Sequence, residues 1–106
     1  MNVNEYGVAF VFSTGFDMSG NTSISITFTK PDLTILTVSN PNVTVPNTPL
    51  TTTDGIFAAN EYARYYFVNG DVNQAGNWSA RVTYNNTGAT PSQHLISDIG
   101  TFTINP

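Results

Sequence analysis

The feature that most constrains the fold is a two-residue alternation of apolar and polar side chains in two separate segments. Residues 23–29 read Ser-Ile-Ser-Ile-Thr-Phe-Thr, and residues 78–84 read Trp-Ser-Ala-Arg-Val-Thr-Tyr. Successive side chains of a β-strand point to opposite faces, so each segment predicts a strand with one buried face and one polar face. Phe28 and Trp78 fall on the apolar faces and are expected in the core. No stretch of the chain has the 3.6-residue period of an amphipathic helix.

The other expected strands lie between clusters of Gly, Pro and Asn, which interrupt regular structure. They cover residues 7–13, 33–38, 43–45, 61–68 and 94–104, the last with Gly100 as a bulge or bend. Loops or turns are expected at residues 16–21, 47–55, 69–76 and 85–92, with one short helical turn at 71–75. About seven short strands in 106 residues predict a single domain, residues 1–106, folded as an all-β, two-sheet antiparallel sandwich.

The composition predicts a surface that is polar but nearly uncharged. Only 9% of the residues are charged, against about 25% in an ordinary soluble domain. Few charges mean weak repulsion between neighbouring molecules, which favours a protein that packs against other subunits. The net charge is −4, and the three cations, Lys30, Arg64 and Arg81, are scattered along the chain. Nucleic acids and anionic membranes are therefore excluded as partners, because both require clustered basic residues.

Targeting and redox signals are missing from the sequence. No apolar run approaches the roughly 18 residues of a membrane span. The N-terminus has no basic region followed by an apolar one, so no signal peptide is expected. Cysteine is absent, which excludes disulfides, thiolate metal sites and a cysteine nucleophile.

Several short motifs follow one another in an order that resembles a known family. An Asp17-Met18-Ser19-Gly20 turn stands before the strand at 23–29, and Lys30-Pro31-Asp32 stands after it. The later motifs are Tyr66-Phe67, Gly70-Asp71, Ala75-Gly76-Asn77-Trp78 and the closing Phe102-Thr103-Ile104. Together they resemble the immunoglobulin-like domain of tailed-phage virion proteins, typified by the N-terminal domain of baseplate upper proteins.

The resemblance implies an immunoglobulin-like sandwich in a non-enzymatic structural protein of a bacteriophage virion, either in the baseplate, tail or neck or decorating the capsid. It implies other virion proteins as partners, with multiple copies in a symmetric assembly, and a virion location after synthesis in the host cytoplasm. It supplies no catalytic residue and no cofactor. Leu33 stands where the family has Gly, which strains any turn that needs a positive φ there. The receptor-binding connection of baseplate upper proteins is not part of these 106 residues.

Five residues are candidates for structural roles in the core or at a chain corner. Trp78, Tyr66 and Phe28 are expected in the core. Asp71 is expected to accept backbone N–H bonds at a corner before Trp78, and Gly76 is expected to adopt a positive φ. A calcium loop at Asp71 and Asn73 is the alternative, but calcium requires six to eight oxygen ligands and two candidates are present.

The segment Val8 to Phe12 is the candidate contact strand. Val8, Phe10 and Phe12 share one face and Ala9 and Val11 the other, so both faces are apolar and expected to be covered, one of them by a partner. For Tyr65, an interface anchor and simple cross-strand packing are equally good interpretations.

Two other functional classes remain as alternatives. A carbohydrate-binding or adhesive module requires an exposed aromatic platform, and Trp78 is the residue that invites this interpretation. An enzyme requires convergent titratable groups. His94 has Ser92, Ser97 and Asp98 nearby in sequence, but no Gly-x-Ser-x-Gly elbow accompanies them. We therefore expect no catalytic site, no metal and no cofactor.

Overall fold

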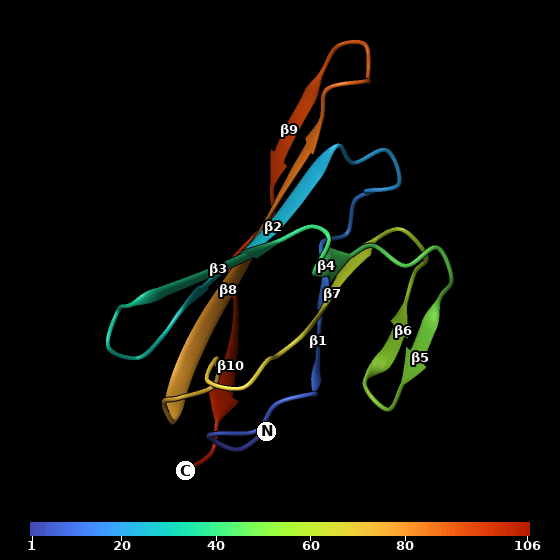
Figure 1. The fold of residues 1–106 in the computed structure, drawn as a ribbon. Helices are drawn as coiled ribbons and strands as arrows, with labels where there is room; N and C mark the ends of the chain where they lie inside the picture. Colours follow the sequence, from blue (N-terminus) through green and yellow to red (C-terminus); the bar gives the residue numbers. More distant parts are fainter.

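The computed structural model describes residues 1–106 and contains strands but no helix. Two antiparallel sheets pack against each other (Figure 1). The larger sheet has the order β10 (Gly100–Ile104), β8 (Gly76–Asn86), β2 (Ser23–Thr29) and β3 (Ile35–Ser39), and β9 (Gln93–Ile96) also pairs with β8. The smaller sheet has the order β1 (Ala9–Ser13), β7 (Tyr62–Tyr66) and β4 (Val43–Thr44).

The chain crosses repeatedly between the two sheets. It passes from β1 to the β2–β3 pair, back to β4 and β7, and then to β8, β9 and β10. The paths β10-β8-β2-β3 and β1-β7-β4 correspond to the G-F-C-C′ and B-E-D strands of immunoglobulin-like sandwiches. The predicted fold class, an immunoglobulin-like sandwich of about seven strands, is confirmed, and three further strands lie outside this frame.

The core is built from the inward faces of β2 and β8 and from the aromatic side chains opposite them. Phe28 lies at its centre, with its ring centroid 4.9 Å from that of Phe10, 5.3 Å from Phe67 and 6.3 Å from Trp78. Phe28 and Trp78 are both fully buried, as predicted from the alternation of their strands. The other inward residues of these strands are Ile24, Ile26, Ala80, Val82 and Tyr84, and all are buried.

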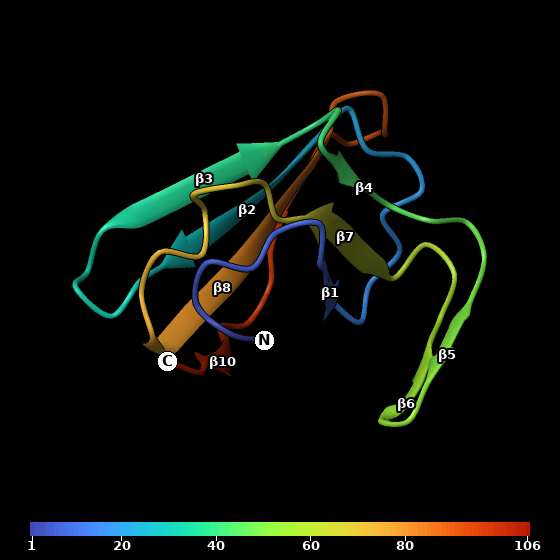
Figure 2. The ribbon, with the colours of Figure 1, turned by 60° about the horizontal axis from the view of Figure 1, so that its bottom comes forward.

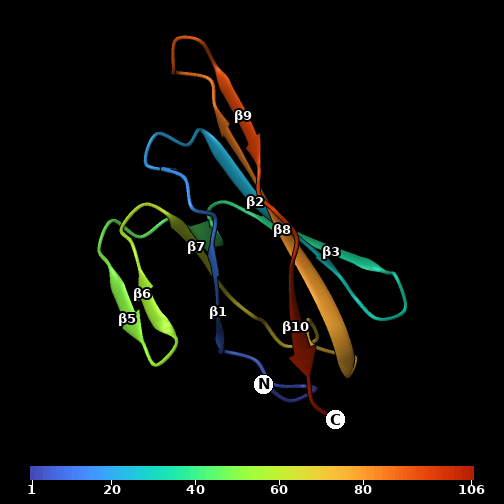
Figure 3. The same cartoon turned by 180° about the vertical axis from the view of Figure 1, so that it is seen from behind.

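The first residues of the chain lie beside its last strand. The backbone N–H of Val3 donates to the carbonyl of Asn105 at 2.8 Å, and that of Asn105 donates to the carbonyl of Met1 at 2.9 Å. Asn2 and Asn105 form a parallel bridge. Both termini therefore leave the molecule at the same end (Figure 3).

The predicted strand at 94–104 is wrong in one respect, because it is divided into β9 and β10. Ser97 lies at the break, where its backbone N–H donates to the carbonyl of Val82 and its Oγ accepts from the Val82 N–H, both at 2.9 Å. Gly100 begins β10 and has no role as a bulge inside a continuous strand. A Cβ atom at Gly100 would lie 2.6 Å from the ring of Phe12, so glycine leaves room there for that ring.

Residues 47–55, expected to form a loop, contain most of an extra hairpin, β5 (Leu50–Thr52) and β6 (Gly55–Phe57). The hairpin lies beyond the smaller sheet, away from the larger one (Figure 2). It joins the sandwich through Phe57, whose ring centroid is 5.8 Å from that of Tyr62. The Tyr62 hydroxyl also donates to the carbonyl of Thr48 at 2.8 Å. The short helical turn expected at 71–75 is absent, since that segment is irregular.

The turn between β2 and β3 keeps its positive φ despite the leucine. The Leu33 N–H donates to the carbonyl of Lys30 at 2.8 Å, and Leu33 has a φ of 71°. The Lys30 N–H in turn donates to the carbonyl of Thr34 at 2.9 Å. This is the three-residue hairpin loop whose last position is left-handed and normally occupied by glycine. The side chain of Leu33 is 79% exposed, so its packing offsets little of the strain of this left-handed conformation.

Candidate docking surfaces

The outer face of the larger sheet is flanked by exposed apolar residues and covered by hydroxyl groups. The alternation that buries the isoleucines and phenylalanine of β2 places the intervening residues outside, and the pairing with β3, β8 and β10 sets similar residues beside them. We call this surface the hydroxyl face. It consists of Ser25, Thr27, Thr29, Thr37, Ser79, Thr83 and Thr101, with Arg81 as its one charged residue.

Three isoleucines border the hydroxyl face. Ile35 pairs with Thr29 and Ile96 pairs with Thr83, so both lie on the outer side, and Ile99 lies beside Arg81 in a shallow hollow. Their exposed fractions are 64%, 53% and 57%. Exposed apolar side chains gathered around a polar surface with few charges are typical of protein contact sites.

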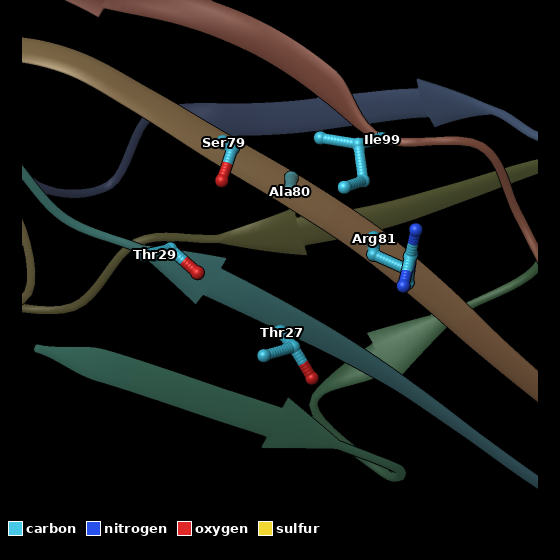
Figure 4. A pocket seen from close by; sticks show the side chains of 6 residues that line it. All are labelled: Thr27, Thr29, Ser79, Ala80, Arg81 and Ile99. Atoms are coloured by element: carbon cyan, nitrogen blue, oxygen red, sulfur yellow. The ribbon is translucent and has the colours of Figure 1, made fainter. Parts of the chain in front are cut away.

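The hollow lies between β2 and β8 and has a volume of about 180 Å³. Its lining consists of Thr27, Thr29, Ser79, Ala80, Arg81 and Ile99, whose side chains are drawn in Figure 4. The cross-strand pairs Thr27–Arg81 and Thr29–Ser79 bring three hydroxyls and the guanidinium to one side of the sheet. No acidic side chain lines the hollow, so it presents a cation and hydroxyl groups to solvent.

Arg81 differs from the other two cations in its surroundings. Lys30 donates a 2.8 Å hydrogen bond from Nζ to Oδ1 of Asn73 and lies 5.3 Å from the centre of the Trp78 ring. Arg64 lies 5.5 Å from the centre of the Tyr66 ring, and its Nε is buried without a hydrogen-bond partner. Both of these cations are packed against aromatic rings, whereas Arg81 is exposed.

The prediction for Tyr66 on β7 is wrong. Tyr66 was expected in the core but is 52% exposed. Tyr65 and Phe67 point inward instead, because their rings pack at 6.2 and 5.3 Å from that of Phe28. Tyr62, at the start of β7, is buried beneath the β5–β6 hairpin.

The side chain of Tyr65 therefore packs in the core against side chains of other strands, and the interpretation of Tyr65 as an interface anchor is wrong. Its side chain is 5% exposed, and its hydroxyl donates a 2.6 Å hydrogen bond to Oδ2 of Asp71. Burial, together with the neighbouring Asp71 carboxylate, raises the pKa of the Tyr65 hydroxyl above its usual range.

Tyr66 borders a second hollow, of about 470 Å³, on the outer side of the smaller sheet. The hollow is lined by Pro41, Asn42, Thr44, Tyr65, Tyr66 and Val68. The sequence did not identify it, because it forms only where β4 ends beside β7. Its exposed aromatic ring and its amide and hydroxyl groups are chemically suited to a sugar.

The predicted corner before β8 has the expected geometry. Oδ2 of Asp71 accepts the backbone N–H of Val68 at 2.9 Å, and Gly76 has a φ of 124°. The indole N–H of Trp78 donates to the carbonyl of Gln74 at 3.0 Å. Asp71 and Asn73 do not converge on a common point of coordination, because Asp71 is engaged by Val68 and Asn73 by Lys30.

β1 is an edge strand with one face in the core. Phe10 and Phe12 pack against the core, and Val8 is half-buried. On the other face Ala9 is exposed and Val11 is half-buried opposite Arg64. The prediction that a partner covers this outer face stays a prediction.

His94 lies exposed on β9, and its Nδ1 is hydrogen-bonded to Oδ1 of Asn85. The Ser97 hydroxyl donates to the carbonyl of Asp98 and accepts from Val82, so backbone groups already engage it. No group of three His, Asp or Glu side chains forms a metal-binding cluster. The chain contains no helical segment with the length and hydropathy of a transmembrane helix.

No family model, curated protein or solved structure matches the chain.

Proposed function

We propose that the protein is a non-enzymatic structural component of a bacteriophage virion, located in the baseplate, tail or neck or decorating the capsid. The observation that carries this proposal is the hydroxyl face: an outward sheet surface of half-buried and exposed hydroxyl residues, with one charged residue and a border of exposed isoleucines. Such a surface repels neighbouring subunits weakly and offers both apolar area and hydrogen-bonding groups to them.

The roles of the motif residues also support the proposal. Oδ1 of Asp17 accepts the N–H of Ser19 at 2.9 Å, and Oδ1 of Asp32 accepts the N–H of Thr34 at 3.0 Å. Gly76 takes a positive φ just before the buried Trp78. The residues that carry the resemblance to phage virion domains therefore hold turns, a corner and the core together, which is what a shared fold requires.

The test is quantitative mass spectrometry of purified phage particles from cells that express the gene. We expect the protein to copurify with the particles at a fixed ratio to the major capsid protein. On the order of hundreds of copies would indicate the shell or tail tube, and about three or six would indicate the neck or baseplate, because those parts have cyclic symmetry. Absence from washed particles would contradict the proposal.

A second candidate function, a carbohydrate-binding or adhesive module, is favoured by the hollow beside Tyr66. An exposed aromatic ring next to Asn42 and Thr44 offers both a stacking surface and hydrogen-bonding groups. Glycan-array binding that is lost in Tyr66→Ala but kept in Tyr6→Ala, a second exposed tyrosine, would support it. Silence on the array together with incorporation into particles would favour the structural role.

A further inference from the structure

The β5–β6 hairpin is a projecting element with little support from its own molecule. Its two strands pair only with each other, and it contacts the sandwich through Phe57 on Tyr62. Isolated two-stranded hairpins are marginally stable in water, because one pair of strands buries little apolar surface. A hairpin of this kind gains order when a second surface covers it.

The outer part of the hairpin carries both a charge and an apolar side chain. Asp54 lies in the two-residue turn, where its backbone N–H donates to Oγ1 of Thr52 at 3.2 Å. The Thr52 hydroxyl donates to the carbonyl of Gly55 at 3.1 Å, which fixes the turn. The Asp54 residue is exposed, and Ile56 on the adjoining strand is 74% exposed.

The hollow on the hydroxyl face is complementary to this tip. It offers the guanidinium of Arg81, three hydroxyl groups and the exposed Ile99 (Figure 4). A carboxylate entering it would pair with Arg81 and accept hydrogen bonds from Thr27 or Ser79, while Ile56 would cover Ile99. The charge-assisted hydrogen bonds of an arginine–carboxylate pair are about twice as strong as neutral ones.

We propose that the β5–β6 hairpin of one copy docks on the hydroxyl face of the next, with Asp54 of the first copy paired to Arg81 of the second. The hairpin lies beyond the smaller sheet, away from the larger sheet that carries the hydroxyl face (Figure 2), so one chain cannot satisfy this contact by itself. The contact is head-to-tail, and it therefore generates a ring or an open filament of copies.

This inference rests on the proposed function in one respect: it names a second copy as an occupant of the docking face. The two remain separable, because self-association is measured on the purified chain and virion membership on particles. A chain that is monomeric yet present in particles would overturn the inference alone. A chain that associates but is absent from particles would overturn the proposed function alone.

The experiment is sedimentation equilibrium of the purified 106-residue chain over a wide range of concentrations. We expect the average mass to rise above the 11.5 kDa monomer with concentration. Asp54→Lys and Arg81→Glu are each expected to weaken association by about tenfold or more, because each leaves like charges facing each other. The double variant Asp54→Lys/Arg81→Glu restores the pair in reverse and is expected to recover most of that loss.

The double variant is the matched control, since it has both substitutions and the net charge of the natural chain. Thermal unfolding of all four proteins checks that the sandwich is intact, and both residues are exposed, so little change is expected. A wild-type chain that stays monomeric at its highest soluble concentration would overturn the proposal. Single variants that associate like wild type, or a folded double variant as weak as the singles, would also overturn it.

Discussion

The hydroxyl of Tyr65 donates a 2.6 Å hydrogen bond to Oδ2 of Asp71, the same carboxylate oxygen that accepts the backbone N–H of Val68. One oxygen atom thus joins the end of the core strand β7 to the corner that leads into β8. Tyr65→Phe removes the donor and keeps the ring, so we expect a loss of about 1–2 kcal/mol in the free energy of unfolding. Denaturant titration measures it, and Tyr66→Phe, on the exposed face, is the control.

The same hydrogen bond predicts the behaviour of the protein in alkali. Burial and Asp71 raise the pKa of Tyr65 in the folded state above its usual value near 10. The folded state therefore holds the Tyr65 proton more tightly than the unfolded state does. The stabilisation that this proton contributes is fully present below pH 10 and is lost as the pH rises above it. Above pH 10, the free energy of unfolding is expected to fall less steeply with pH for Tyr65→Phe than for wild type. Equal slopes would contradict the assignment.

Leu33→Gly is expected to stabilise the protein by about 1 kcal/mol, because the left-handed conformation costs a non-glycine residue roughly 1–2 kcal/mol and glycine loses some chain entropy in return. Leu33 has a φ of 71° and is largely exposed, so little packing is lost. Leu33→Ala keeps the strain and serves as the control. A gain in melting temperature shared by both variants would mean that removal of the exposed side chain, and not the backbone, is responsible.

Trp78→Ala is expected to destabilise the sandwich by about 3–5 kcal/mol, since it opens a cavity beside Phe28 and Phe67. The ring is fully buried, so Trp78→Phe should cost less than the alanine variant. Thermal unfolding gives the ranking. Unchanged unfolding accompanied by a loss of glycan binding would contradict the core assignment and favour a stacking role.

The carboxyl group of Asp32 is expected to have a pKa well below that of an ordinary aspartate. Hydrogen bonds from the side chain of Thr34, from Gln74 and from the Thr34 backbone lower its pKa to about 2. Because the folded-state pKa lies below the unfolded value of 3.8, the stabilisation is present above that value and is lost as the pH falls toward 2. NMR titration of the carboxyl group measures this, and Thr34→Ala is expected to raise the pKa.

Val11→Glu tests whether the outer face of β1 contacts a partner. Val11 is half-buried and pairs with Arg64, so a carboxylate there has a neighbouring cation and the isolated domain should remain folded. We expect weaker incorporation into particles with little change in the melting temperature. Unfolding of the variant would place Val11 in the core, and unchanged incorporation would remove β1 from the contact surface.

Strict alternation made the core of the larger sheet and its hydroxyl face predictable, because each residue of β2 and β8 has one possible side once its neighbour is buried. β7 has aromatic side chains on both faces, so its period could not indicate which face was inward, and Tyr66 was placed wrongly. The inward side of β7 depends on Phe28, which lies on β2, far away in the sequence, and packs against Tyr65 and Phe67. The β5–β6 hairpin was missed because its threonines and flanking prolines also occur in loops. The hollow at Arg81 could not be predicted, because Ile99 lines it only after strands that are distant in sequence have paired.

The bridge between Asn2 and Asn105 joins residues from almost the full length of the chain, which makes it one of the most non-local contacts in the fold. Contacts of that kind form late, since the entropy of closing so long a loop is lost before the contact stabilises anything. The adjacent ends also make the domain a natural candidate for circular permutation. A short peptide linking Pro106 to Met1, with new ends opened in the exposed turn at Thr53–Asp54, would turn this last contact into a local one and should speed folding while leaving the sandwich unchanged.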